Sequence, residues 1–172
     1  MIITLFGYMG CGKSSLGKLL AENLNYAFID LDLHIENLHG MAVKDIFQLK
    51  GEVYFRKIES EILKKVCRTQ ANTVLSLGGG TPCYGNNLSF LKQNSLVRSF
   101  YIKLSTSVLS KRLKLSKKKR PLISEILDKD VEEFVSKHLF ERSAYYNRAD
   151  QIIDADHKSK EQIINEIKAC LS

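Results

Sequence analysis

The stretch GYMGCGKS, residues 7–14, decides the fold of this chain, because an apolar run precedes it and a helical pattern follows it. Its spacing, Gly7-x4-Gly12-Lys13-Ser14, is that of a phosphate-binding loop between a strand and a helix. Glycines let backbone amides turn inward around an anion, where a Cβ would obstruct or strain the turn. The helix N-terminus adds unpaired amides and a favourable dipole. We therefore expect a nucleotide phosphate to bind at this loop.

Individual side chains of the loop have distinct expected roles. Lys13 can bridge the β- and γ-phosphates of ATP, and the Ser14 hydroxyl can ligate Mg²⁺. A chance glycine-rich turn is the alternative, but the strand before the loop and the helix after it argue against that. The loop does not identify the phosphate acceptor, since switch GTPases, motor ATPases and small-molecule kinases all share it. The predicted ATP contacts in the loop are Gly10, Cys11, Gly12, Lys13, Ser14 and Ser15.

Short apolar runs alternate with amphipathic stretches along the chain, and no repeat or linker divides it. The alternation indicates a single domain, 1–172, in which a central parallel sheet forms the middle of three α/β/α layers. Ligands in such folds bind beyond the carboxyl ends of the strands. The predicted strands are 2–6, 26–29, 73–77, 97–104 and 151–153. The predicted helices are 14–24, 43–49, 53–67, 86–94, one through Leu109 and Leu113, 125–146, and one through Ile163, Ile164 and Ile167.

The composition is that of an ordinary globular protein, with 44% hydrophobic and 26% charged residues. The apolar start lacks a basic leader, and no run approaches the roughly 18 apolar residues of a membrane span. The four cysteines form no CxxC pair and no metal-ligand spacing, which favours free thiols in a reducing compartment. We therefore expect a soluble, cytoplasmic protein.

The net charge of +7 suits nucleic acid, an anionic membrane or small anionic substrates, and composition alone does not choose among them. No aromatic-interleaved RNA-binding motif, zinc finger or basic heptad pattern is visible. We therefore expect small-molecule partners, with no nucleic acid and no membrane.

Two acids, Asp30 and Asp32, follow the second predicted strand. No guanine-specific N-K-x-D motif is present, and no acid follows the apolar run 74–77 as it would in many ATPases. Magnesium support therefore falls to Asp30. If the chain stays extended, the period-two alternation of a strand puts both carboxylates on one side, and Asp32 can accept a hydrogen bond from a substrate hydroxyl. The alternative is that these acids only form a turn or cap a helix.

Other polar motifs suggest the acceptor side of a site. Arg56 and Glu59 lie three residues apart on one helical face, either as a surface ion pair or as an arginine fork for a substrate carboxylate. The triplet 78–80 is either a flexible turn or a place where a ligand approaches backbone amides. The run 117–120, KKKR, is either a solvated charge run or part of a mobile lid over the phosphates. Arg142 is ambiguous on its own.

Taken together, these segments resemble the shikimate kinase family over nearly the whole chain. The phosphate loop is widely shared, but Asp-x-Asp, Phe-Arg-x-x-Glu and the glycine triplet together are specific to that family. The matching pieces are the loop at 7–14, Asp-x-Asp at 30–32, Asp-Ile-Phe at 45–47, Gly-Glu-x-x-Phe-Arg-x-x-Glu at 51–59, the triplet at 78–80, Arg-Pro-Leu at 120–122, and Arg142 with Tyr146 and Ala149-Asp150.

The resemblance implies a nucleoside-monophosphate-kinase-like fold with a mobile lid at about 114–125 and a substrate-binding region at about 31–60. It implies transfer of the ATP γ-phosphate to the 3-hydroxyl of shikimate, in the chorismate pathway of aromatic amino-acid biosynthesis, by a monomer. By matching position, Lys13, Asp32 and Arg120 would be catalytic, and Ser14 and Asp30 would serve Mg²⁺. Arg112 and Arg120 would contact ATP. The implied shikimate-binding residues are Asp32, Arg56, Gly78, Gly79, Gly80 and Arg142.

Two rival functions remain open at this stage. A related small-metabolite kinase, such as a gluconate kinase, would share the loop and lid but would not require the arrangement of Arg56, Glu59 and Arg142. A nucleotide-binding module that associates with nucleic acid would explain the net charge, but would leave Asp30 and Asp32 without a role.

Overall fold

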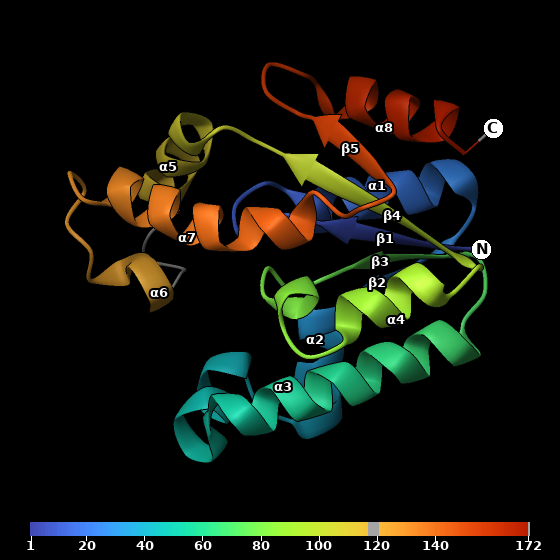
Figure 1. Cartoon of the computed structure of the whole chain (residues 1–172), viewed down its shortest axis with the longest axis horizontal. Coiled ribbons are helices and arrows are strands. Elements are labelled where there is room, and N and C mark those ends of the chain that lie inside the picture. The colour runs from blue at the N-terminus through green and yellow to red at the C-terminus, as the bar shows by residue number, and fades with distance from the viewer. Residues whose placement is uncertain (117–120, 172) are drawn as a thin grey trace.

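The protein is described by a computed structural model that covers residues 1–116 and 121–171. A five-stranded sheet forms its centre, with the strand order β2-β3-β1-β4-β5 and every neighbouring pair parallel (Figure 1). The strands are β1 (Ile2–Phe6), β2 (Ala27–Asp30), β3 (Thr73–Ser76), β4 (Val97–Lys103) and β5 (Gln151–Asp154). All five predicted strands are thus confirmed, and the sheet is parallel as expected.

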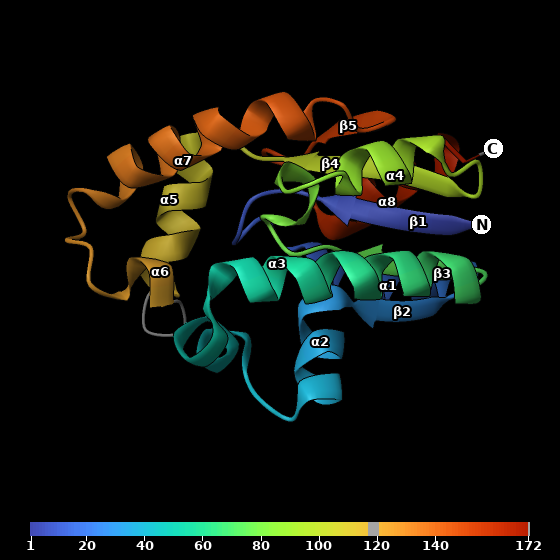
Figure 2. The same cartoon turned by 60° about the horizontal axis from the view of Figure 1, so that its bottom comes forward.

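Helices cover both faces of the sheet, which confirms the three-layer α/β/α architecture. One face carries α1 and α8, and the other carries α3, α4 and α7 (Figures 1 and 2). The helices are α1 (Lys13–Leu24), α2 (Leu31–His39), α3 (Val43–Thr69), α4 (Asn87–Gln93), α5 (Thr106–Leu115), α6 (Pro121–Ser124), α7 (Val131–Tyr146) and α8 (Lys160–Ala169), and a short 3-10 turn, η1, spans Thr81–Cys83.

The order of the strands places a crevice at the carboxyl edge of the sheet. The connection from β1 to β2 crosses the sheet in one direction, whereas those from β2 to β3, from β3 to β4 and from β4 to β5 cross in the other. Because such crossovers are right-handed, their helices lie on opposite faces. The loops after the neighbouring strands β1 and β3 therefore diverge, which is where ligands bind in open parallel sheets.

Two helical segments differ from the sequence-based expectation, and one predicted break is confirmed. A helix, α2, begins directly after β2, where no helix was predicted. The predicted break between residues 49 and 53 is confirmed as a kink, because Gly51 has φ 81° and ψ 168° and a residue with a Cβ rarely adopts that conformation. The predicted helix 125–146 starts later, at Val131, after the separate short helix α6.

The core lies on both sides of β1, whose five residues are all buried. Large side chains from several elements fill it, among them Phe6, Phe55, Phe100 and Tyr146. This core holds the carboxyl ends of β1, β2 and β3 in fixed positions relative to one another. None of the described helices combines the length and the apolarity that crossing a bilayer requires.

Candidate active site

The phosphate loop leaves the first amides of α1 free for an anion. Gly12 is the N-cap of α1, with φ 95°, and no side chain caps the helix. The left-handed conformation at this position suits glycine, since a side chain there would be strained. The N-terminal N–H groups of a helix have no partner within the helix, so they are available to phosphate oxygens.

Lys13 begins α1 and folds back over the loop. Its Nζ donates to the carbonyl oxygens of Gly7 at 2.7 Å and of Tyr8 at 3.2 Å, and only 8% of the residue is exposed. A desolvated ammonium held at the mouth of the phosphate loop is well placed to attract phosphate charge, because Coulomb interactions strengthen as the surroundings become less polar. The predicted position of Lys13 beside the phosphates is consistent with this geometry.

Ser14 and Asp30 meet at the start of α1 and the end of β2. The Ser14 hydroxyl donates to Asp30 Oδ2 at 2.5 Å, and Asp30 Oδ1 accepts the N–H of Leu33 at 3.3 Å. Asp30 is therefore both the N-cap of α2 and the partner of the loop serine. The helix cap that the sequence offered as the alternative is thus present, and magnesium support by Asp30 stays a prediction. A hydroxyl and a carboxylate are the hard oxygen ligands that Mg²⁺ prefers.

The condition of an extended chain at residues 30–32 is not met, because α2 begins at Leu31. Leu31 and Ile35 are both fully buried. Because they lie four residues apart, a helix that begins directly after β2 places both side chains on the face that packs against the core. Asp32 consequently lies in the first turn of α2. It does not share a strand face with Asp30, and it faces the loop after β3, where a Cβ on Gly78 would lie 2.7 Å from its Oδ1.

The carboxyl group of Asp32 has an unusual proton affinity. Burial raises its pKa to about 6, the negative charges of Glu59 and Asp30 act in the same direction, and the positive charges of Lys13 and Arg56 oppose them. A carboxylate with a raised pKa is a better proton acceptor than an ordinary aspartate at neutral pH. This property is compatible with the predicted role of Asp32 as proton acceptor, which stays a prediction.

Each glycine of the triplet 78–80 lies against one of the polar residues predicted to bind the acceptor. Cβ atoms built on these glycines would lie 2.7 Å from Asp32, 3.7 Å from Arg142 and 2.6 Å from Arg56. The middle glycine also approaches the phosphate loop, since its Cβ would lie 3.6 Å from the backbone N of Met9. The absence of side chains here therefore opens the space between the phosphate loop and these three residues.

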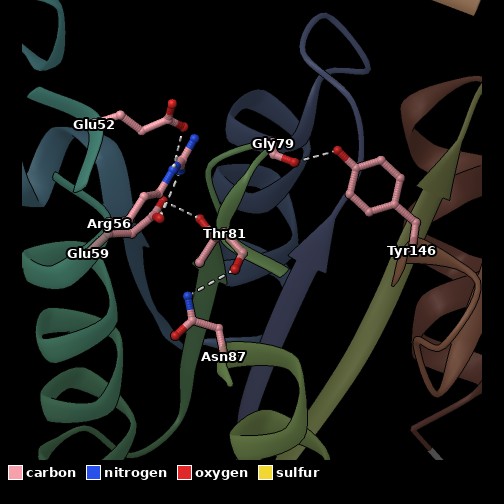
Figure 3. Close-up of polar contacts among 7 residues, drawn as sticks. All are labelled: Glu52, Arg56, Glu59, Gly79, Thr81, Asn87 and Tyr146. Carbon is pink, nitrogen blue, oxygen red and sulfur yellow. Dashed lines mark hydrogen bonds and ion pairs between the residues drawn. The ribbon is translucent and has the colours of Figure 1, made fainter. Parts of the chain in front are cut away.

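Arg56 projects from α3 towards the triplet, and two carboxylates hold it. Its Nη1 donates to Glu59 Oε2 at 2.9 Å, and its Nε donates to Glu52 Oε1 at 3.3 Å (Figure 3). Glu59 is 1% exposed, and its other oxygen accepts the hydroxyl of Thr81 at 2.6 Å. The Arg56–Glu59 pair is thus an anchored internal contact rather than a surface ion pair.

Thr81 was not singled out from the sequence, although it directly follows the triplet. Its carbonyl oxygen accepts Asn87 Nδ2 at 2.9 Å, so a chain of hydrogen bonds runs from Arg56 through Glu59 to the start of α4 (Figure 3). Position next to the triplet was the only signal in the sequence, because the partner in α3 is 22 residues away along the chain.

Arg142 approaches the triplet from α7, since a Cβ on Gly79 would lie 3.7 Å from its Nη1. Its Cζ lies 5.7 Å from the centre of the Tyr8 ring in the phosphate loop. One turn later on α7, the hydroxyl of Tyr146 donates to the carbonyl of Gly79 at 2.5 Å (Figure 3). Tyr8 is itself tied to α7, since its hydroxyl lies 3.0 Å from His138 Nδ1. These contacts bring Arg142 next to the triplet and the phosphate loop, and its part in substrate binding stays a prediction.

Arg112 lies at the outer side of the phosphate loop. Its Nη1 donates to the carbonyl of Cys11 at 3.4 Å, and the side chain extends from α5 into solvent. This position is compatible with the predicted contact to ATP and leaves the adenine contact a prediction. The whole KKKR run of the predicted lid, 117–120, lies outside the described residues, and with it Arg120, the other arginine predicted to contact ATP.

Fold and site together define a P-loop kinase of a small, carboxylate-bearing molecule. The model of the family described as "Shikimate kinase" matches residues 9–172. A shikimate kinase of Flavobacterium psychrophilum is 44% identical over 98% of this chain and 98% of its own length. The chain belongs to the shikimate kinase family and is therefore a kinase that uses ATP.

Solved structures support the same assignment. The crystal structure of shikimate kinase from Bacteroides thetaiotaomicron, at 33% identity, superposes with a TM-score of 0.93 over 99% of this chain and 98% of that chain. Shikimate kinase from Acinetobacter baumannii, solved in complex with shikimate, is 29% identical with a TM-score of 0.88 over 99% of this chain and 92% of that chain. The nucleoside-monophosphate-kinase-like fold expected from the sequence is thereby confirmed.

Proposed function

We propose that this protein transfers the γ-phosphoryl group of ATP to the 3-hydroxyl of shikimate, and thus supplies shikimate 3-phosphate to aromatic amino-acid biosynthesis. The observation that carries the proposal is the convergence of Asp32, Arg56 and Arg142 on the glycine triplet, next to Lys13 and the phosphate loop. A carboxylate base and two arginines around one glycine triplet suit a substrate that carries both hydroxyl groups and a carboxylate.

The proposed reaction is mainly a matter of placement. Arg56 and Arg142 hold the carboxylate of shikimate from opposite sides, and the backbone of Gly79 and Gly80 lies along the ring. Asp32 accepts a hydrogen bond from the attacking hydroxyl, orients it towards the γ-phosphorus and takes its proton. Lys13 balances the charge that develops on the phosphoryl oxygens, with Arg120 proposed to add to this from the lid. Charge stabilisation and positioning account for most of the acceleration in phosphoryl transfer.

Mg²⁺ is the cofactor that we propose, held by Ser14 and by Asp30. Their oxygens meet at 2.5 Å, next to the N-terminus of α1, which is where the β- and γ-phosphates are expected. Mg²⁺ commonly takes only one or two protein oxygens in kinases, with phosphate oxygens and water completing its shell. When bound, it would neutralise phosphate charge.

We also propose that the protein acts as a cytoplasmic monomer on small anions, without nucleic-acid or membrane partners. The net charge of +7 is consistent with two substrates that are both negatively charged. The molar mass from light scattering, measured with and without added RNA, tests both parts of this proposal.

The activity is tested by coupled ADP release with shikimate, quinate and gluconate at matched concentrations. We expect turnover with shikimate that depends on Mg²⁺, and NMR of the product should place the phosphate on the 3-hydroxyl. Turnover that favours gluconate, or ADP release that does not depend on any of the three acceptors, contradicts the proposal.

Replacing Gly80 by alanine should weaken shikimate binding without weakening the fold. Gly80 has φ −90° and ψ −20°, which alanine adopts readily, but the new Cβ would lie 2.6 Å from Arg56 Nη2 and 2.8 Å from Nη1. We expect the KM for shikimate to rise about tenfold as the guanidinium is displaced, which corresponds to about 1.4 kcal/mol. The KM for ATP and the melting temperature serve as internal controls and should stay near their original values. An unchanged KM for shikimate contradicts the assigned position of Arg56.

A further inference from the structure

The ring of Tyr84 stacks on the guanidinium group of Arg56. The distance from Arg56 Cζ to the centre of the Tyr84 ring is 3.9 Å, against 5.3 Å for Phe55 and 5.7 Å for Phe47. Tyr84 is thus the aromatic residue in closest contact with this arginine. Planar guanidinium groups stack favourably on aromatic faces, and the attraction grows as the pair loses contact with water.

Two of the three nitrogens of the Arg56 guanidinium already donate hydrogen bonds. Glu59 accepts from Nη1 and Glu52 accepts from Nε, whereas Nη2 has no hydrogen-bond partner among the residues that the structure describes. The hydroxyl of Tyr84 also lies near Glu52 and is the main cause of the lowered pKa of that carboxyl. With its face against Tyr84 and two of its nitrogens bonded, the guanidinium presents Nη2 to a ligand.

Without the Tyr84 ring, the Nη2 edge of the Arg56 guanidinium, which Glu52 and Glu59 do not hold, would have room to shift. Arg56 borders an open hollow of about 390 Å³, into which a long side chain can swing. The other residues that line this hollow are Lys57, Ser60, Glu61, Lys64, Tyr84, Gly85 and Asn87. A long side chain that is free to take several rotamers loses conformational entropy when it binds a ligand, so fixing it beforehand strengthens binding.

Tyr84 has little to do with the stability of the fold. Its side chain is on the surface, with 37% of the residue exposed, and it follows the η1 turn (Thr81–Cys83) directly. Its position also joins it to the acceptor site, since η1 continues from the glycine triplet. The stacking contact is therefore separable from the packing of the core.

We infer that Tyr84 is a positioning residue for the acceptor: its ring holds the Arg56 guanidinium in the orientation that binds the substrate carboxylate. The inference rests on the proposed function, because it takes the carboxylate of shikimate as the ligand of Arg56. Tyr84 acts through Arg56 and takes no part in phosphoryl transfer.

The test compares Tyr84→Leu, which removes the aromatic face, with Tyr84→Phe, which keeps it and removes the hydroxyl. We expect Tyr84→Leu to raise the KM for shikimate about three- to tenfold, in the range of a partly desolvated cation–π contact, and Tyr84→Phe to stay within about twofold of the original. The kcat, the KM for ATP and the melting temperature should change little in both variants. In an Arg56→Met background, Tyr84→Leu should lower kcat/KM for shikimate by less than about twofold, because its partner is gone.

Three results would overturn the inference. These are an unchanged KM for shikimate in Tyr84→Leu, an equal rise in Tyr84→Phe, or the same loss of kcat/KM in the Arg56→Met background as in the original protein. Any of them leaves the proposed function standing if the unmodified protein phosphorylates shikimate. Absence of that activity in the unmodified protein overturns the proposed function, and the inference with it.

Discussion

In the Asp32→Asn variant, kcat for shikimate phosphorylation should fall by about 10²–10⁴-fold, with a much smaller change in the KM for shikimate. Asparagine has nearly the same shape and can still contact a hydroxyl, but it cannot take a proton. Orientation and proton acceptance by Asp32 matter in the transition state, so their loss appears in kcat. Steady-state kinetics measure both constants, and Glu22→Gln, on the exposed side of α1, is a control that removes an acid outside the site. Full activity of Asp32→Asn would remove the proposed base from the mechanism.

The pH dependence of kcat/KM for shikimate is a second test of the role of Asp32. Burial raises the pKa of its carboxyl to about 6, so kcat/KM for shikimate should fall as pH drops through about 6 in the original protein. We expect Asp32→Glu, which keeps a carboxylate, to show the same fall of kcat/KM at low pH. Asp32→Asn should lack this fall, because it has no group that titrates at this position.

The raised pKa also predicts an effect on stability. Folding favours the protonated form of Asp32, so its contribution to stability is present at low pH and is lost as pH rises from about 4 to about 6. Above that range, Asp32→Asn should therefore be more stable than the original protein, by at most about 3 kcal/mol. Denaturant unfolding at pH 7.5 and pH 4 measures the difference. Equal stability of both proteins at pH 7.5 would argue against a buried, charged Asp32.

In the Arg56→Lys variant, the KM for shikimate should rise by about 10- to 100-fold, with a smaller change in kcat. A charge-assisted hydrogen bond contributes about 1.5–3 kcal/mol, and an ammonium group cannot reproduce the planar fork or the contacts with Glu52 and Glu59. Binding of shikimate to the variant can also be measured directly by calorimetry.

Arg68→Lys, in the exposed last turn of α3, is the matched control and should leave both constants unchanged. A KM for shikimate that Arg56→Lys leaves unaltered would return Arg56 to the status of a structural ion pair. A rise in the KM for ATP of the same size would instead indicate damage to the phosphate loop.

The strands and the phosphate loop were readable from the sequence because their signals are local. The apolar runs at 2–6 and 73–77, each followed directly by glycines, mark strands that end at a ligand-binding edge. The helix α2 was not predicted, because in a helix of nine residues the four-residue spacing of Leu31 and Ile35 is a weak local signal. The late start of α7 at Val131 likewise reflects the weakness of local signals at helix ends.

The candidate site could be named from the sequence only in part. The residues of the loop, the two acids, Arg56, the triplet and Arg142 were all singled out beforehand. Thr81 and Tyr84 were not, because a threonine and a tyrosine after a glycine triplet carry no pattern of their own. Their partners, Glu59 and Arg56, lie in a different helix, and only the packing of α3 against the triplet brings them into contact.

By itself, the sequence determined that this chain has a phosphate loop on a parallel sheet. It also indicated which side chains are candidates for binding a hydroxylated carboxylate. These are properties of spacing along the chain, which periodic backbone geometry converts directly into strand, turn and helix. Only the tertiary structure decided how the acceptor side is assembled around that loop. The raised pKa of Asp32 depends on burial and on charged groups from α1, β2 and α3, and the position of Arg56 depends on its packing against the triplet. These distant segments meet only when the sheet has brought them to one edge.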